Sequence, residues 1–166
     1  IGAGTMGRGI AEVAAVAGLD VLIVEVSESQ RKIAQTQVRN SIEHGVRSGK
    51  IFAGGGSGAT ADAAAAADAI AGRIIWTGDM DVASMTKFVI EAVPETMKIK
   101  RVVFEEVSKA VPESTLFASN TSALSISEMG RYSGRPAKVL GMHFFNPAHV
   151  MKLVEIIPGL DTAQET

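Results

Sequence analysis

A histidine and a glutamate lie inside an apolar stretch near the end of the chain, GMHFFNPAHVMKLVEII, residues 141–157. We expect His143 and Glu155 to be buried there. Burying an unpaired carboxylate is costly unless it shifts its pKa, finds a partner or binds a metal. Both residues are equidistant from His149, so two antiparallel strands with a short connection would place them opposite each other. Pro147 favours a turn in that connection.

An imidazole beside a carboxylate is a common arrangement for a general base. Glu155 would hold one ring nitrogen of His143 as a proton donor and leave the other free to accept a proton. A purely structural pair in the core is the alternative. Ligands bind open parallel sheets at the carboxyl ends of the strands, where we expect both groups. A nucleotide-type motif earlier in the chain therefore favours the catalytic interpretation.

The chain opens with a glycine-rich turn, GAGTMG, which fits G-x-G-x-x-G. Gly2 permits a tight turn, Gly4 lets the backbone approach a pyrophosphate, and Gly7 lets helix and strand pack closely. The N–H groups that begin the helix would hold the phosphates. Glu25 ends the next strand, where an acid hydrogen-bonds the ribose hydroxyls of NAD. A 2′-phosphate would meet a like charge, and the nearest arginine is Arg31, so the pattern favours NAD over NADP. A packing turn with a strand-end acid is the alternative.

Two further polar clusters follow apolar runs, SNTS at residues 119–122 and EAVPE at residues 91–95. Ser122 either caps the next helix or donates its hydroxyl to a substrate oxygen. Glu95 and Lys100 either contact the sugar of a cofactor or pair with each other. If exposed, that ion pair would contribute only about 0–1 kcal/mol.

Alternating apolar runs and helical stretches predict the sheet that would position these groups. The pattern favours an α/β, Rossmann-like, doubly wound and mostly parallel sheet, whose strands are apolar on both faces. The last two strands are joined by too few residues for a crossover helix, so they should be antiparallel. The strand before the glycine turn retains only its last residue. The expected strands are 20–25, 73–77, 88–93, 116–121, 138–144 and 152–157, and the expected helices are 5–18, 28–48, 59–71, 97–110 and about 125–130.

One biased segment, rich in glycine and alanine, covers residues 53–72. Its glycines would form a flexible turn, and alanine is the best helix former. We expect it to complete a helical hairpin that protrudes from the body, with a disordered linker as the alternative.

The bulk composition excludes several classes of function. The 166 residues are 46% hydrophobic and 20% charged, with a net charge of −2. That charge gives no field favouring nucleic acid or an anionic membrane, and no run approaches the roughly 20 apolar residues of a membrane span. Cysteine is absent, as are H-E-x-x-H and G-x-S-x-G, so the sequence supports neither a metal site nor a hydrolase nucleophile. We expect His44 and His149 at the surface. We expect a cytoplasmic protein, or a mitochondrial or peroxisomal one in a eukaryote.

Four segments together resemble the NAD-binding domain of the L-3-hydroxyacyl-CoA dehydrogenases, which include the 3-hydroxybutyryl-CoA dehydrogenases. They are IGAGTMGRGIAEVAA, FVIEAVPE, ASNTSALSI and GMHFFNPAHVMKLVEII. The resemblance implies that His143 is the catalytic base, that Glu155 is its partner, and that Ser122 contacts the 3-oxygen of the substrate. The family commonly has Asp where this chain has Glu25, whose longer arm still reaches both ribose hydroxyls. The resemblance also implies NAD contacts from Gly2, Gly4, Thr5, Met6, Gly7, Glu25, Glu95, Lys100, Asn120 and Asn146.

The resemblance implies NAD-dependent oxidation of L-3-hydroxyacyl-CoA to 3-ketoacyl-CoA, as in fatty acid β-oxidation or butanoate metabolism. It assigns residues 1–157 to the NAD-binding domain and residues 158–166 to the start of a C-terminal all-helical domain absent from this chain. In the family that domain closes over the acyl chain and forms a homodimer, so this chain alone would bind NAD with little or no turnover. The family grips CoA at the helical hairpin, where Arg47 and Lys50 are candidate phosphate contacts. A solvated helix face explains those two residues as well.

Three other interpretations remain open. The first is a hydroxyacid dehydrogenase of another lineage with a lysine base, which the His–Glu pair disfavours. The second is a nucleotide-binding regulatory module without catalysis. The third is a family member that acts on a sugar acid, like the proteins that resemble lambda-crystallin. A substrate screen, with competition by acetoacetyl-CoA, would separate them.

Overall fold

Short strands alternate with helices in the computed structural model, which describes residues 1–51 and 62–166. The helices are α1 (Thr5–Val16), α2 (Glu28–Arg47), α3 (Ala63–Ala71), α4 (Met97–Ala110) and α5 (Ile126–Ser133), with short 3-10 turns at Asp81–Met85 and Pro136–Lys138. The strands are β1 (Val21–Val24), β2 (Ile74–Thr77), β3 (Phe88–Glu91), β4 (Leu116–Ser119), β5 (Val139–Phe144) and β6 (Val154–Pro158).

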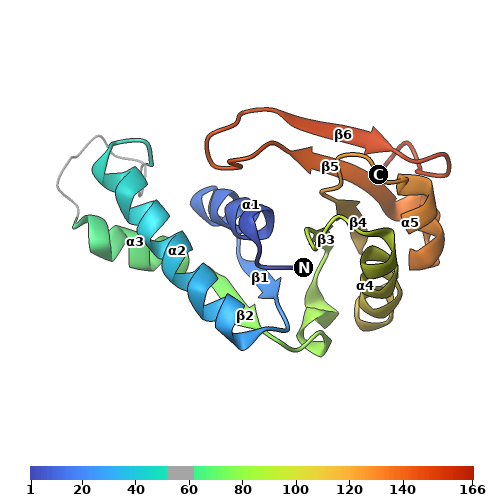
Figure 1. Cartoon of the computed structure of the whole chain (residues 1–166), viewed down its shortest axis with the longest axis horizontal. Helices are drawn as coiled ribbons and strands as arrows, with labels where there is room; N and C mark the ends of the chain where they lie inside the picture. Colours follow the sequence, from blue (N-terminus) through green and yellow to red (C-terminus); the bar gives the residue numbers. More distant parts are fainter. Residues whose placement is uncertain (52–61) are drawn as a thin grey trace.

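The strands form two hydrogen-bonded groups, β1–β2 and β3–β4–β5–β6. All neighbours are parallel except β5 and β6, which are antiparallel. The first two residues lie between the groups. The Gly2 N–H donates to the Val24 carbonyl and the Ala92 N–H donates to the Ile1 carbonyl, both at 2.9 Å. The predicted Rossmann-like, mostly parallel arrangement with an antiparallel last pair is therefore confirmed (Figure 1).

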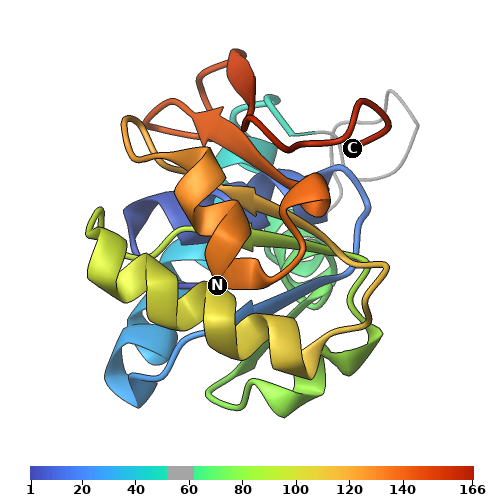
Figure 2. The ribbon, with the colours of Figure 1, turned by 90° about the vertical axis from the view of Figure 1, so that its right-hand side faces the viewer.

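Two apolar cores hold the helices against the strands. Helices α4 and α5 lie side by side beside the second group of strands (Figure 2). The first core joins α1, α2 and α3 to β1 and β2, through Ala11, Ala15, Ile23, Ala34, Val38, Ile42, Ala67, Ile70 and Ile74. The second joins α4 and α5 to β3, β4 and β5, through Val89, Phe104, Val107, Phe117, Ile126, Met129 and Val139.

Helices α2 and α3 form the predicted helical hairpin. Ala67 of α3 shares a core with Val38 of α2, and Arg39 Nε donates to Asp68 Oδ1 at 2.7 Å. The base of the hairpin packs on β1 and β2, and its end extends beyond the sheet (Figure 1). The predicted start of the second helix, residue 59, falls within residues 52–61, which lie outside the described part of the chain.

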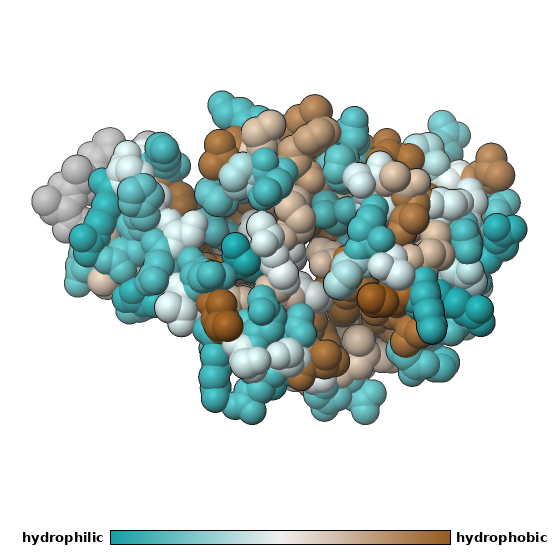
Figure 3. Space-filling view, in the orientation of Figure 1, coloured by the Kyte–Doolittle hydropathy of each residue, from teal (hydrophilic) through white to brown (hydrophobic). Residues whose placement is uncertain are grey.

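The last strand, β6, is largely exposed, so the expectation that helices cover the strands of the sheet is wrong there. Ile156 is 58% exposed. Apolar side chains lie along the upper edge of the molecule, over β5 and β6, in Figure 3. The physical reason is that β6, the outer strand of its group, packs chiefly against β5, and no helix of the described residues packs extensively on it. Among residues 1–51 and 62–166, no helix combines the length and apolar character that crossing a bilayer requires.

The chain after β6 turns back onto α5 and the start of β5. The Leu160 N–H donates to Ser127 Oγ at 2.9 Å, and the Thr162 hydroxyl donates to the Val139 carbonyl. The domain boundary predicted after residue 157 falls inside β6, which ends at Pro158.

Candidate active site

His143 and Glu155 form the pair that the sequence predicted. They lie opposite each other in the β5–β6 ladder, and His143 Nδ1 is 2.8 Å from Glu155 Oε2. The other ring nitrogen, Nε2, makes no hydrogen bond within the described residues. His143 precedes the last residue of β5, whereas Glu155 is near the beginning of antiparallel β6. The pair therefore meets at the edge of the sheet where the parallel strands end.

The expected burial of Glu155 is wrong. Its side chain is 50% exposed, compared with 19% for His143. The carboxylate therefore does not carry the cost of a buried charge, because it belongs to the open strand β6. Its contact with the imidazole still orients the ring. The ring of Phe145, whose centroid is 4.7 Å from that of His143, lies next to the imidazole.

The glycine turn has the geometry that a pyrophosphate requires. Gly2 has a φ of +94°, which side-chain-bearing residues rarely adopt, and a Cβ on Gly7 would lie 2.0 Å from the Gly2 carbonyl oxygen. A Cβ on Gly4 would meet nothing within 4 Å, so the approach to the turn is open. No side chain caps α1, which leaves the first-turn N–H groups, those of Thr5 and Met6 included, for an anion. The residues present fit NAD.

Glu25 directly follows β1, beside this turn. Its Oε2 accepts the Ala3 N–H and its Oε1 accepts the Ser27 N–H, each at 3.0 Å. The carboxylate is thus fixed between the glycine turn and the start of α2. In the sequence no arginine is adjacent to Glu25, and Arg31 is six residues away. In the structure Arg31, on α2, lies next to Glu25, and its Nη1 donates to the Glu25 backbone carbonyl. That expectation is corrected, and Glu25 still presents the like charge that disfavours a 2′-phosphate.

Lys100 and Glu95 pair with each other, and a buried partner joins them. Lys100 Nζ lies 3.1 Å from Glu95 Oε2 and 2.7 Å from Glu91 Oε1. Lys100 and Glu91 are each 1% exposed, and the Ser119 hydroxyl donates to Glu91. In this structure the Lys100 ammonium is thus engaged by two carboxylates. A direct contact between Lys100 and the cofactor stays a prediction.

Ser122 does not cap a helix, so that alternative is wrong. Helix α5 begins at Ile126 and is capped by Ser125. Ser122 instead lies against Glu95, whose Oε1 accepts the Ser122 N–H at 2.9 Å and the Thr121 hydroxyl. Partial burial alone would raise the pKa of Glu95. Hydrogen bonds from Thr121, from the Ser122 N–H and from Lys100 outweigh it and lower that pKa to about 2.

The two asparagines take different places around the pair. Asn120 Oδ1 accepts the Phe144 N–H at 2.8 Å and ties the end of β4 to the end of β5. Asn146 is exposed and lines a hollow of about 360 Å³ between α1, α2 and the β5–β6 connection. Its lining includes the polar residues Thr5, Arg8, Glu12, Ser41 and His149.

Sequence reasoning missed Glu12, a buried acid in this lining. It is 4% exposed, and the Ser41 hydroxyl donates to its Oε1 at 2.7 Å. Burial raises the pKa of Glu12, against the hydrogen bond from Ser41 and the nearby charges of His149 and Arg8. Sequence reasoning also gave no role to Glu91. The sequence feature that could have indicated its role is a charged residue within an apolar strand, nine positions before Lys100 on the next helix.

Other candidates lie away from the pair. Arg47 and Lys50 are exposed at the far end of α2, where Arg47 pairs with Glu43. His44 and His149 are exposed, as predicted. In the part of the chain that the structure describes, no three His, Asp or Glu side chains gather as a metal site would need.

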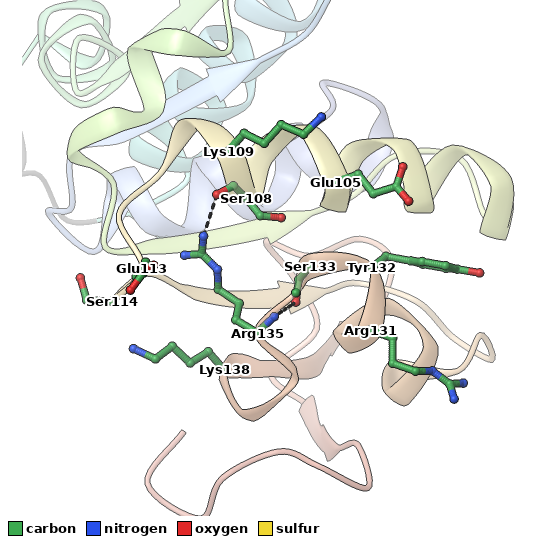
Figure 4. A pocket seen from close by; sticks show the side chains of 11 residues that line it. Glu105, Ser108, Lys109, Glu113, Ser114, Arg131, Tyr132, Ser133, Arg135 and Lys138 are labelled. Carbon is green, nitrogen blue, oxygen red and sulfur yellow. Dashed lines mark hydrogen bonds between the residues drawn. The ribbon is translucent and has the colours of Figure 1, made fainter.

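A second hollow, of about 900 Å³, lies between α4 and α5 (Figure 4). Glu113 precedes β4 and Lys138 precedes β5, so this hollow opens at the opposite edge of the sheet from the His–Glu pair. Arg135 is already engaged there, donating to the Ser108 and Pro112 carbonyls at 2.6 Å. The hollow therefore does not belong to the candidate active site.

The glycine turn, the acid that follows β1 and the strand order define an NAD-binding domain of the Rossmann type. The family model for the 3-hydroxyacyl-CoA dehydrogenase NAD-binding domain matches residues 1–166. The chain belongs to this family.

Named relatives agree with that assignment. A probable 3-hydroxybutyryl-CoA dehydrogenase of Deinococcus radiodurans is 35% identical over all of this chain, which spans 55% of that protein. A 3-hydroxyadipyl-CoA dehydrogenase of Escherichia coli is 36% identical over 99% of this chain, which spans 32% of it. The crystal structure of (S)-3-hydroxybutyryl-CoA dehydrogenase from Ralstonia eutropha matches 99% of this chain and 54% of its own, with a TM-score of 0.88 and 34% identity. The chain thus spans about half or less of these proteins.

Proposed function

We propose that this chain is the NAD-binding part of an enzyme that oxidises L-3-hydroxyacyl-CoA to 3-ketoacyl-CoA, with His143 as the general base. The observation that carries the proposal is the 2.8 Å contact between His143 Nδ1 and Glu155 Oε2 at the ligand-binding edge of the sheet. That contact makes Nδ1 the protonated nitrogen and leaves Nε2 as the acceptor. The relatives whose names specify 3-hydroxyacyl-CoA substrates support the choice of substrate class.

Each residue of the site has a separate task in the proposed reaction. His143 Nε2 takes the proton from the 3-hydroxyl, and Glu155 stabilises the imidazolium that results. The hydroxyl of Ser122 orients the 3-oxygen. NAD supplies the acceptor for the hydride that leaves C3, and the glycine turn and Glu25 hold it. General-base help of this kind is worth about 10²–10⁴-fold in rate.

The proposal includes a further, all-helical part of the protein that completes the substrate site and forms a homodimer. Two observations support it. The chain spans 55% of the Deinococcus radiodurans relative. The apolar side chains of Leu153, just before the outer strand β6, and of Ile156 and Ile157, on that strand, are exposed. Large uncovered apolar surfaces commonly mark contacts with another domain or subunit.

The test is the oxidation of NADH by acetoacetyl-CoA, followed by absorbance, in the longest form of the protein that its gene encodes. We expect turnover with NADH and much less with NADPH. Sugar acids and 2-keto acids should neither react nor compete with acetoacetyl-CoA. Tight NADH binding without acetoacetyl-CoA reduction would contradict the proposal and favour a non-CoA acid substrate or a non-catalytic module.

A further inference from the structure

One carboxylate oxygen, Glu95 Oε1, faces three hydrogen-bond donors. They are the Thr121 hydroxyl, the Ser122 N–H at 2.9 Å and the Ser122 hydroxyl at 3.3 Å. A carboxylate oxygen offers about two lone pairs, and a typical O–H···O contact is about 2.7–2.8 Å. The Ser122 hydroxyl has the longest of the three contacts. It is therefore the surplus donor, held weakly.

The carboxylate itself is fixed and cannot turn to meet the Ser122 hydroxyl better. Its Oε2 lies 3.1 Å from Lys100 Nζ, and Glu91 holds that ammonium with contacts of 2.7 and 2.8 Å. Both carboxylates come from the end of β3, Glu91 as its last residue and Glu95 from the loop that follows, and the Lys100 and Glu91 side chains are excluded from water. Glu95 thus presents Oε1 in one position toward Thr121 and Ser122.

Thr121 is also fixed. It is 2% exposed, and its oxygen accepts the Leu124 N–H at 2.9 Å. A hydroxyl has one proton to donate, and here that proton goes to Glu95. Thr121 therefore fills one lone pair of Glu95 Oε1 permanently, and the Ser122 N–H fills the other.

We propose that Thr121 is a positioning residue, which satisfies Glu95 so that the hydroxyl of Ser122 is free to turn to the 3-oxygen of the substrate. The inference rests on the proposed function for its substrate. Without the Thr121 hydroxyl, the Ser122 hydroxyl becomes the second strong donor to Glu95 and turns away from the substrate. Thr121 acts through Ser122 and touches neither substrate nor cofactor.

The kinetic test compares Thr121→Val with Thr121→Ser and Ser122→Ala in the longest form of the protein that its gene encodes. Thr121→Val removes the hydrogen bond from the Thr121 hydroxyl to the charged Glu95, so it should lower kcat about tenfold. The affinity for NADH, measured by fluorescence, should change less than about twofold. Thr121→Ser keeps the hydroxyl and should restore kcat. Because Thr121 acts through Ser122, adding Thr121→Val to Ser122→Ala should cost nothing further. If the two effects multiply, or if Thr121→Ser is as slow as Thr121→Val, the inference is wrong.

A second readout needs no substrate. The pKa of Glu95, about 2, can be followed by carbon-13 NMR of labelled glutamate, with Glu95→Gln for assignment. Thr121→Val should raise it by about one unit, because a charged hydrogen bond is lost. Ser122→Ala should raise it by less than about half a unit, since the hydroxyl is a surplus donor. A larger rise in Ser122→Ala overturns the inference, even if Thr121→Val does not fold. If the wild-type protein does not reduce acetoacetyl-CoA, the proposed function fails, and the titration still decides whether Thr121 or Ser122 satisfies Glu95.

Discussion

At the scale of single residues, the His143–Glu155 pair combines a partly buried base with a half-exposed partner. The carboxylate holds the Nδ1 side of the ring at 2.8 Å, so the ring cannot flip without losing the contact. Because water reaches Glu155, its ionised form carries little desolvation cost. The pair can therefore orient the base without the strain of a buried charge.

Glu155→Gln tests whether the charge of the partner matters. The amide oxygen can still accept from Nδ1–H, but it cannot stabilise an imidazolium as a carboxylate does. We expect kcat for acetoacetyl-CoA reduction to fall about 10²-fold. NADH affinity should stay unchanged, since Glu155 lies outside the glycine turn. Glu113→Gln, at the opposite edge of the sheet, is the matched control and should keep full activity. Equal rates in the two variants would remove Glu155 from the mechanism.

Some of these residues could be found from the sequence and others could not. The positions of His143 and Glu155 about a proline turn predicted their register. The exposure of Glu155 was not predictable, because apolar neighbours look the same in the sequence whether or not another layer covers them. The role of Thr121 depends on Glu95, which is 26 positions away, so no local pattern indicates it.

At the scale of elements, the start of α1 is built by glycines with different duties. Gly7 is needed for packing, because a Cβ there would lie 2.0 Å from a backbone carbonyl. Gly4 faces open space, so its lack of a side chain serves access to the turn. Substitutions at Gly7 and at Gly4 can therefore test stability and cofactor binding separately within one motif.

Gly4→Ala and Gly7→Ala form a matched pair. Gly7→Ala should lower the free energy of unfolding in urea by about 3 kcal/mol, since the backbone must shift. Gly4→Ala should leave that free energy within about 0.5–1 kcal/mol, the ordinary effect of a glycine substitution. Its NADH affinity should fall about tenfold or more, because the added methyl group displaces the pyrophosphate from the N–H groups. A Gly4→Ala protein that binds NADH normally would contradict this assignment of the turn.

The contact between α1 and α2 carries a titratable group that affects stability. Burial raises the pKa of Glu12, so the folded protein releases its proton less readily than the unfolded chain does. The free energy of unfolding therefore falls as the pH rises from the pKa of Glu12 in the unfolded chain through its higher pKa in the folded protein. Below the ordinary value of 4.5 both states are protonated, and the cost disappears.

Glu12→Gln should accordingly raise the free energy of unfolding at pH 7. The amide oxygen can keep the hydrogen bond from Ser41 without a buried charge. The gain should shrink as pH falls and vanish below about 4. Urea unfolding over a pH series is the measurement, with Glu113→Gln as the exposed control. A gain that stays constant from pH 7 to pH 4 would show that the charge of Glu12 is not its cause.

The sequence predicted the elements well, because period and turn residues are local signals. The types of the strands and α-helices were correct in the described residues, where the differences lie at the element ends and in the 3-10 turns at Asp81–Met85 and Pro136–Lys138, which were not predicted. Helix α5 starts at Ile126, after its cap Ser125, and the predicted strand ends after β3 and β4 are loops that carry Glu95 and Thr121. These loop geometries depend on long-range hydrogen bonds, which no local pattern specifies.

At the scale of the whole molecule, the exposed apolar side chains in and just before β6 are the feature that the chain does not explain by itself. Leu153, Ile156 and Ile157 are exposed beside the His143–Glu155 pair. We have proposed that a further part of the protein covers them. If so, replacing an exposed isoleucine by asparagine should destabilise the protein more on β6 than on a strand that nothing covers.

Ile156→Asn and Ile75→Asn compare two isoleucines of similar exposure in this chain, 58% and 62%. In the longest form of the protein that its gene encodes, Ile156→Asn should lower Tm by about 2–4 °C, because a covered isoleucine contributes about 1.5–3 kcal/mol. Ile75, on the outer strand β2, should tolerate the change with a shift below about 1 °C. Equal shifts would mean that nothing covers β6.

The central claim is that His143 is the base that takes the proton from the substrate. The direct measurement is the single-turnover rate of NADH oxidation by acetoacetyl-CoA in His143→Ala, in the longest form of the protein that its gene encodes, beside the dissociation constant for NADH. We expect a rate about 10²–10⁴-fold below that of the wild type, with NADH binding retained. A His143→Ala protein that keeps most of the wild-type rate would contradict it.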